Sequence, residues 1–240
     1  MRHKNIINTG GRFMYTLHIA NKNYSSWSLR PWILFRELHI PFAEYNHPFN
    51  ADREKQQSEF AVFSPTCRVP VLEDGGNTIW DSLAIIEYVA EEYPAVWPED
   101  KKARAWARSV CAEMHAGFPA LRSECGMNCS LRIDLHARSE ALQAELVRLD
   151  RLLSEGLSRF GGPFLAGSRF TAADAFFAPV VFRIRTYDLQ LSELSSEYVQ
   201  QMLELRGMRA WYEAALQETA RLPLYEDKSG VGNIVQDYRN

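Results

Sequence analysis

The chain has 240 residues, 46% of them hydrophobic and 24% charged, and its formal net charge at pH 7 is −3. This length allows two modest domains with separate cores, and the composition is that of an ordinary globular protein. So small a net charge gives no global basic field, so we expect no nucleic-acid partner and no attachment to an anionic membrane. No run of about 18 apolar residues predicts a membrane span.

The N-terminus carries charge but no apolar segment typical of a secretory signal, which favours a cytoplasmic location. We interpret residues 1–13 as a flexible extension. The four cysteines form no C-x-x-C pair, and Cys125 and Cys129 lack His or Cys partners at zinc-binding spacing. Free thiols and no metal site are therefore expected.

Residues 14–93 have the pattern of one α/β domain. Strands are predicted over residues 15–20 and 41–47, and a hairpin over 69–72 and 78–80 around Asp74-Gly75-Gly76, a strong signal for a tight turn. Helices are predicted over 29–38, weakly over 52–60, and over 82–92, where apolar residues share one face. This order predicts a single mixed sheet with helices packed on it.

A different pattern follows a linker at 94–102, which Pro94 and Pro98 mark. Helical periodicity predicts helices over 103–125, 134–160, 171–187, 198–206 and 208–218. We therefore predict an all-helical domain over 103–226, and residues 227–240 resemble a loose tail. Thr171 and Asp174 have the spacing of a capping box, and replacing Asp174 by Ala should cost about 0.5–2 kcal/mol of stability.

The first candidate binding feature is Val69-Pro70 at the start of a predicted strand. Proline cannot donate to a sheet ladder, so it belongs at a strand's first residue, where a cis bond is feasible. A cis bond would turn the main-chain groups of Val69 outward to pair with the backbone of a ligand. Taken alone, the pair is more often plain turn chemistry.

The second feature is Asp81-Ser82, where the next helix begins. The Ser82 hydroxyl and the first helical N–H groups would hold a carboxylate at the positive end of the helix dipole. Asp81 could receive an ammonium group. A plain N-cap is the alternative. With Val69, these residues suggest a ligand that carries an α-amino acid group at one end and an amide further along.

The third feature is the loop Tyr24–Arg30, which enters the first helix. Serines stand where a redox protein of this layout would carry C-x-x-C, so thiol–disulfide exchange by the protein is not expected. A serine hydroxyl or N–H at a helix N-terminus can instead stabilise a thiolate brought by a ligand, because the thiol pKa falls at such positions. Simple capping of the helix is the alternative.

Together these motifs resemble the cytosolic glutathione S-transferase family over about residues 14–223. The run SSWSLRPW, from Ser25 to Trp32, is similar to the S-S-C-S-x-R signature of the zeta class, whose members include maleylacetoacetate isomerases. The run TIWDSLAIIEYVAEEYP is also close to that class. Trp27 replaces the signature cysteine, a departure that bears on isomerase activity but not on glutathione binding.

The resemblance implies a thioredoxin-like N-terminal domain, an all-helical C-terminal domain and a homodimer. It implies that Val69 binds the cysteinyl backbone of glutathione and that Asp81 and Ser82 hold its γ-glutamyl end. Ser25 aligns with the catalytic serine and Ser26 lies beside it. The candidate glutathione-binding residues are Trp27, Arg30, Arg68, Val69, Pro70, Asp81 and Ser82, and the candidate electrophile pocket is Met114, His115, Phe118 and Arg122.

The expected function is conjugation of glutathione to a small electrophile, as in detoxification, with the thiolate stabilised by a first-loop serine. One alternative is glutathione-dependent cis–trans isomerisation of a maleyl-type acid, which an arginine-lined pocket would favour. Another is a binding or regulatory protein that keeps the fold without activity. Within the candidate pocket, Met114 and Phe118 could equally be core residues, whereas His115 and Arg122 could polarise a carboxylated substrate.

Overall fold

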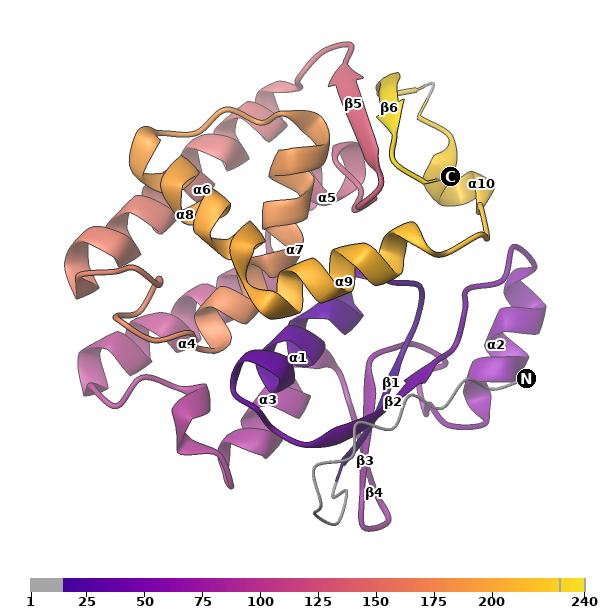
Figure 1. The fold of residues 1–240 in the computed structure, drawn as a ribbon, viewed down its shortest axis with the longest axis horizontal. Helices are drawn as coiled ribbons and strands as arrows, with labels where there is room; N and C mark the ends of the chain where they lie inside the picture. The colour runs from indigo at the N-terminus through magenta and orange to yellow at the C-terminus, as the bar shows by residue number, and fades with distance from the viewer. Residues whose placement is uncertain (1–14, 229, 240) are drawn as a thin grey trace.

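The computed structural model describes residues 15–228 and 230–239 (Figure 1). The extension expected at residues 1–13 lies outside them. The N-terminal half is a mixed sheet with helices and the C-terminal half is helical, as predicted. The N-terminal elements are β1 (Tyr15–Ile19), α1 (Ser26–Glu37), β2 (Phe42–Asn46), α2 (Arg53–Ala61), β3 (Val71–Asp74), β4 (Asn77–Trp80) and α3 (Ser82–Ala90).

The sheet has the strand order β2-β1-β3-β4. β1 pairs in parallel with β2 and antiparallel with β3, and β3 and β4 form the predicted hairpin. Gly75 and Gly76 have φ of 54° and 96°, a backbone that glycine adopts without steric cost, so this turn depends on the Gly-Gly pair. The local turn signal was therefore sufficient to predict the hairpin.

The C-terminal half departs from the prediction where one long helix was expected over 103–125. α4 (Lys101–Ala116) ends before Gly117, and α5 (Pro119–Glu124) begins after Phe118. A Cβ on Gly117 would lie 2.7 Å from the carbonyl oxygen of Glu113, so glycine is needed there. Phe118 adopts a left-handed φ of 59°, and Pro119 takes the first helical position, which proline favours.

A two-stranded antiparallel sheet is the second departure from an all-helical half. β5 (Leu131–Leu135) pairs with β6 (Gly232–Asp237), which is formed by residues expected to be a loose tail. Leu131 and Ile133 are buried and alternate with more exposed residues, so β5 has a strand pattern of only five residues. The remaining elements are η1 (Pro94–Val96), α6 (Glu140–Phe160), α7 (Ala172–Tyr187), α8 (Glu193–Glu204), α9 (Arg206–Leu216) and α10 (Pro223–Glu226).

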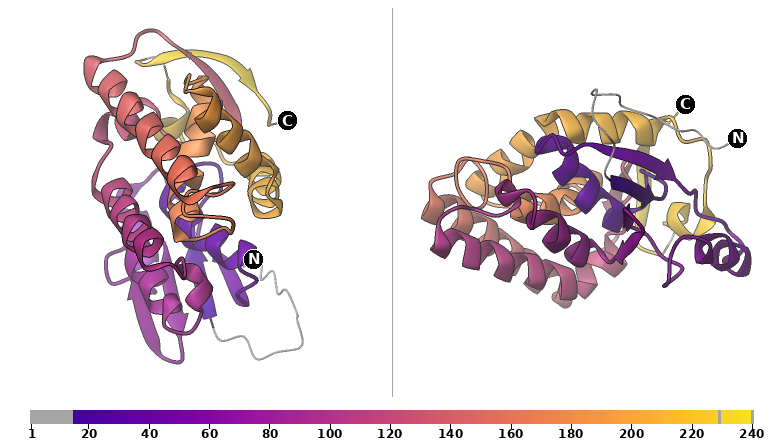
Figure 2. Two further views of the ribbon diagram at one scale, coloured as in Figure 1. Left: turned by 90° about the vertical axis from the view of Figure 1, so that its left-hand side faces the viewer. Right: turned by 90° about the horizontal axis from the view of Figure 1, so that it is seen from below.

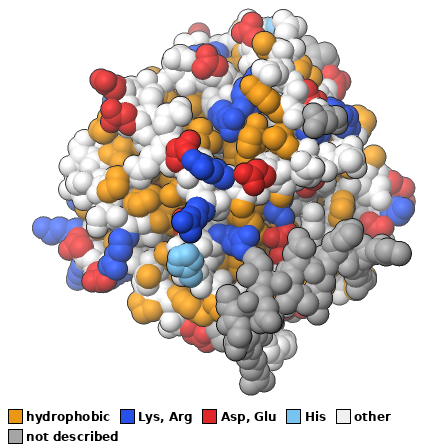
Figure 3. Space-filling view, in the orientation of Figure 1, with side chains coloured by type: hydrophobic (Ala, Val, Ile, Leu, Met, Phe, Trp, Pro, Cys, Tyr) orange, Lys and Arg blue, Asp and Glu red, His pale blue; other side chains and the backbone are white. Residues whose placement is uncertain are grey.

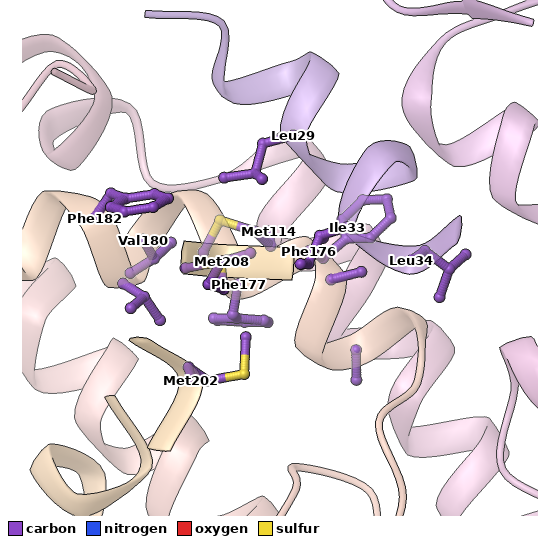
Figure 4. Packing of buried hydrophobic residues seen from close by; sticks show 14 of the residues in the cluster. Leu29, Ile33, Leu34, Met114, Phe176, Phe177, Val180, Phe182, Met202 and Met208 are labelled. Carbon is purple, nitrogen blue, oxygen red and sulfur yellow. The ribbon is translucent and has the colours of Figure 1, made fainter. Parts of the chain in front are cut away.

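The two halves share one hydrophobic core in which α1 packs against α7. Figure 4 shows Leu29 and Ile33 of α1 beside Phe176 and Val180 of α7, and all four side chains are almost fully buried. The predicted capping box is present at the start of α7, because Asp174 Oδ2 accepts a 2.9 Å hydrogen bond from the Thr171 N–H. α7 is thus the central helix against which α1 of the N-terminal half packs.

The sheet of the N-terminal half lies below the salmon and orange helices of the C-terminal half in the left view of Figure 2. The face shown in Figure 3 carries positive and negative side chains close together, with hydrophobic ones scattered among them. That face therefore presents no field of a single sign. Within the described ranges, no helix combines the length and the apolar character that a membrane crossing requires.

Candidate functional site

Three features singled out in the sequence meet at one end of the sheet. The register pairs His18 of β1 with Val71 of β3, and Val71 with Trp80 of β4. The end of β1, the start of β3 and the end of β4 therefore lie side by side. Consequently the serine loop after β1, the Val69-Pro70 pair before β3 and the Asp81-Ser82 pair after β4 all approach the same edge.

Ser25 and Ser26 lie at the N-terminus of α1. Ser25 is 5% exposed, and its hydroxyl donates a 2.7 Å hydrogen bond to Ser28 Oγ. Ser28 Oγ also accepts a hydrogen bond of 3.3 Å from the Ala20 N–H. Ser26 is partly exposed and is the first residue of the helix. First-turn N–H groups have no partner within their own helix and carry the positive end of the dipole, so this position suits an anion.

The Val69–Pro70 peptide bond is cis, as is feasible for a proline at the start of a strand. Val69 is partly exposed, whereas Pro70 is buried. Arg68 is exposed, and its main-chain N–H and C=O both bond to Ser64 Oγ, at 3.0 and 2.6 Å. The loop is thus fixed by Ser64 immediately before Val69.

Asp81, rather than Ser82, is the N-cap of α3. Its Oδ1 accepts a 2.8 Å hydrogen bond from the Leu83 N–H, and its φ is +75°, which is uncommon for a residue other than glycine. Its Oδ2 lies 3.4 Å from His115 Nε2. Ser82 is completely buried, and its hydroxyl accepts a 3.2 Å hydrogen bond from Arg30 Nη1 while keeping its own proton for donation.

The Arg30 and Arg122 guanidinium groups converge on one carbonyl oxygen, that of Met114. Arg30 Nη2 lies 3.4 Å from this oxygen, and Arg122 Nη2 also donates to it. Met114 belongs to the last turn of α4, where carbonyls lack helical partners and the dipole attracts cations. Within the described ranges neither guanidinium forms an ion pair with a carboxylate. Burial, followed by repulsion from Arg122 and Arg183, lowers the pKa of Arg30 to about 9.

Trp27 connects these cations to His115. Its ring centroid is 4.2 Å from Arg30 Cζ and 5.1 Å from Arg122 Cζ, distances typical of cation–π contacts. The His115 ring meets the Trp27 ring edge-on, with centroids 5.1 Å apart. Trp27, Arg30, His115 and Arg122 thus form one cluster that also includes Asp81 and Ser82.

His115 is partly buried in this cluster, with a side chain 26% exposed. Burial lowers the pKa of the imidazole, the charge of Asp81 opposes this, and Arg30 and Arg122 lower it further. Burial and the two arginines thus favour the neutral form of the imidazole. Its Nδ1 is buried and has no hydrogen-bond partner among the described residues.

Met114 and Phe118, the other two residues expected in the electrophile pocket, have side chains in the hydrophobic core. Met114 and Phe118 are 2% and 5% exposed and belong to the core shared by the two halves, which was the alternative considered for them. Met114 contributes its carbonyl oxygen to the cluster instead of its side chain. Phe176 of α7 was missed in the sequence, although its ring lies 4.6 Å from Arg30 Cζ, because only the docking of α7 on α1 brings it there.

A cavity of about 920 Å³ lies between α2, the loop before β3 and α10. Its lining includes Arg53, Cys67, Arg68 and Tyr225. Of these four residues, Arg68 was predicted from the sequence to belong to the site. The cavity therefore borders the loop residues that directly precede Val69. No sequence signal indicated that α10 would line it.

This arrangement defines a thioredoxin-like domain, followed by a helical domain, with a serine at the N-terminus of the first helix. Residues 24–92 match the family described as "Glutathione S-transferase, N-terminal domain", and residues 136–214 match "Glutathione S-transferase, C-terminal domain". The chain belongs to the glutathione S-transferase family. The fold and the family expected from the sequence are thereby confirmed.

Individual relatives agree with this assignment. A probable maleylacetoacetate isomerase of Vibrio cholerae is 28% identical over 169 residues, which cover 68% of this chain and 77% of the relative. Glutathione S-transferase F14 of Arabidopsis thaliana is 29% identical over 200 residues, covering 75% and 78%. A glutathione transferase homologue from Burkholderia, solved with bound glutathione, superposes with a TM-score of 0.63 at 24% identity, covering 85% and 100%.

Proposed function

We propose that the protein binds reduced glutathione and joins its sulfur to a small electrophile. The observation that carries this proposal is the hydrogen bond between Arg30 Nη1 and Ser82 Oγ. It ties α1, which begins directly after Ser25, to α3, which begins directly after Asp81. Two helix N-termini are thereby held together next to Val69, an arrangement suited to a ligand with several negative groups.

In the proposed complex, the N–H groups at the start of α3 and the Ser82 hydroxyl hold the γ-glutamyl carboxylate. Asp81 accepts from the ammonium group, and the main chain of Val69 pairs with the cysteinyl residue. The thiol then lies at the N-terminus of α1, where the helix dipole and a serine hydroxyl lower its pKa and its proton leaves to solvent. The Ser25 hydroxyl turns from Ser28 to the sulfur. The sulfur lone pair forms the new C–S bond as the leaving group departs with its electrons.

A second candidate function is glutathione-dependent cis–trans isomerisation of a maleyl-type acid. Arg30 and Arg122 form an arginine-lined site without a carboxylate partner among the described residues, and a carboxylated substrate would balance their charge. The thiolate would add to the double bond, rotation would follow about the resulting single bond, and elimination would return the thiolate. The names of several relatives agree with this chemistry.

The test compares the wild type with Ser25→Ala and Ser26→Ala. Glutathione affinity is measured by calorimetry, and turnover with a chloronitroaromatic, a neutral epoxide and a maleyl-type acid. We expect Ser25→Ala to depress turnover far more than glutathione affinity. An unchanged rate in Ser25→Ala would move the role to Ser26 or to a main-chain N–H, whereas glutathione binding without turnover of any substrate would favour the non-catalytic alternative.

We also propose, from the family resemblance, that the protein is a cytoplasmic homodimer with a role in detoxification. Sedimentation velocity of the purified chain tests the dimer. A monomer at micromolar concentration would contradict it.

A further inference from the structure

The loop that leads into the serines is held by residues of the C-terminal half. Glu218 accepts hydrogen bonds from the N–H groups of Lys22 and Asn23, at 2.6 and 3.1 Å. Trp211 Nε1 donates a 2.7 Å hydrogen bond to the carbonyl oxygen of Lys22. The carbonyl oxygen of Asn23 accepts from the Cys129 N–H at 3.2 Å. The N-terminal half therefore does not fix this loop by itself.

Tyr24, the residue directly before Ser25, makes the most specific of these contacts. Its hydroxyl donates to the Glu226 carboxylate and accepts a 3.0 Å hydrogen bond from Arg239 Nη1. Its ring stacks on Tyr225, with centroids 4.7 Å apart. Tyr24 is only 4% exposed, so these partners determine where its side chain and backbone lie.

Arg239 is the second-last residue, yet its side chain is 2% exposed. Arg239 Nη2 lies 2.6 Å from Glu226 Oε1, and Arg239 Nε lies 3.4 Å from Asp237 Oδ1. Burial alone would lower the pKa of Arg239, but its bonds to Glu226 and Tyr24 outweigh that and raise it. A long charged side chain is rarely buried this deeply unless it is paired, so the contact is specific.

The segment that carries these residues is anchored at both ends. We name residues 218–228 and 230–239 the strap. It starts where α9 ends, contains α10 and β6, and is held by the pairing of β6 with β5 and by the bond from the Tyr238 N–H to the Ser130 carbonyl oxygen, at 3.0 Å. In Figure 1 the strap is the yellow segment beside β5, above α2. Tyr225 also stacks on Phe49, with centroids 5.6 Å apart, so the strap contacts the approach to α2.

From these contacts we infer that Arg239 and Glu226 are positioning residues for the reaction. They hold the Tyr24 hydroxyl, Tyr24 fixes the backbone of Ser25, and Ser25 is thereby aligned with the sulfur of the ligand. The inference rests on the proposed function, because it assigns the strap a role in the same thiolate site. Neither strap residue contacts the ligand in this scheme, so their loss affects alignment and not the glutathione anchors at Val69 and Asp81.

The test uses Arg239→Met, Tyr24→Phe and Arg239→Lys in the full chain. Thiolate absorbance gives the pKa of bound glutathione, calorimetry gives its Kd, and a chloronitroaromatic gives kcat. For Arg239→Met and Tyr24→Phe we expect kcat to fall about tenfold or more and the thiol pKa to rise, with Kd within about twofold, because small misplacements of reacting groups are costly. Arg239→Lys should recover part of the loss, and the double variant should lose little more than either single one.

Arg221→Met is the matched control. Arg221 pairs with Asp237, and its Nη1 also lies 3.8 Å from Glu226 Oε2, but its side chain is half exposed and makes no direct contact with Tyr24 among those described. Because the contacts among Glu226, Tyr24 and Arg239 remain in this variant, kcat and the thiol pKa should change far less than in Arg239→Met. Equal effects of Arg221→Met and Arg239→Met would reduce the strap to a stabilising segment and overturn the inference.

Hydrogen exchange separates failure of the inference from failure of the proposed function. Without any ligand, the amides of residues 22–26 should exchange faster in Arg239→Met than in Arg221→Met. If the wild type does not bind glutathione, the proposed function fails whatever the exchange shows. If the wild type binds and turns over but Arg239→Met matches it in exchange and in thiol pKa, the strap inference alone is wrong.

Discussion

Replacing Asp174 by Ala should destabilise the protein more than the loss of an ordinary helix cap. The carboxylate is fully buried and accepts from the N–H groups of Leu165 and Thr171, both at 2.9 Å, and from the Tyr198 hydroxyl at 3.1 Å. The alanine variant leaves two buried N–H groups without an acceptor, at about 1–3 kcal/mol each, or roughly 2–6 kcal/mol in all. Burial of the carboxylate raises the pKa of Asp174 to about 6, which shows that burying its charge is unfavourable. Alanine removes this unfavourable contribution, so we expect a loss of stability in the lower part of the range, about 2–4 kcal/mol.

Urea unfolding followed by circular dichroism and tryptophan fluorescence measures this difference. Asp52→Ala is the matched control, because Asp52 is an exposed N-cap of α2 whose Oδ1 accepts from Glu54 and Lys55 N–H at 3.0 and 3.1 Å. The control should lose about 0.5–2 kcal/mol. If Asp174→Ala costs no more than Asp52→Ala, then Asp174 acts as a simple cap and the contribution of Leu165 and Tyr198 is refuted.

Two further predictions concern ligand affinity and pH. Ser82→Ala should mainly weaken glutathione binding, by about tenfold, because it removes a hydrogen bond to a charged group; unaltered affinity in calorimetry would refute the assignment of this anchor. Because the folded-state pKa of Asp174 is raised from 3.8 to about 6, its contribution to stability is fully present below 3.8 and is lost as the pH rises through about 6. Unfolding free energies of the wild type minus those of Asp174→Asn should therefore fall over this interval, and a flat difference would contradict the raised pKa.

The N-terminal half was predictable because its signals are local. The Asp74-Gly75-Gly76 turn fixes the hairpin, and apolar periodicity fixes α3. Gly117 and Pro119 are local signals for the break between α4 and α5. The break was not predicted, because the helical periodicity continues on both sides of it. The pairing of β5 with β6 could not be predicted, because five alternating residues find their partner about a hundred positions later.

The candidate site divides in the same way. Ser25, Val69 and Asp81 each stand beside the end of an element, so their positions followed from local patterns and from the order of the strands. The contacts of Trp27 and Arg30 on α1 with Arg122 on α5 depend on how the C-terminal half packs against α1, which no single segment encodes. Met114 illustrates the limit, because helical spacing placed it near the site but could not indicate that its carbonyl oxygen, not its side chain, would serve there.

The position of α4 also explains why Arg30, which is buried, and Arg122, which is partly buried, pair with no carboxylate among the residues that the structure describes. The N-termini of α1 and α3 present positive dipole ends to the proposed site, but α4 directs its negative C-terminal end to the same place. Without nearby positive charge, the C-terminal end of α4 would repel an anion that is bound at the N-termini of α1 and α3. Arg30 and Arg122 donate to the Met114 carbonyl and cover it with positive charge. Carboxylate partners would satisfy the guanidinium groups equally well but would cancel that charge, so pairing with carbonyl oxygens keeps all three helix ends favourable to a negatively charged ligand.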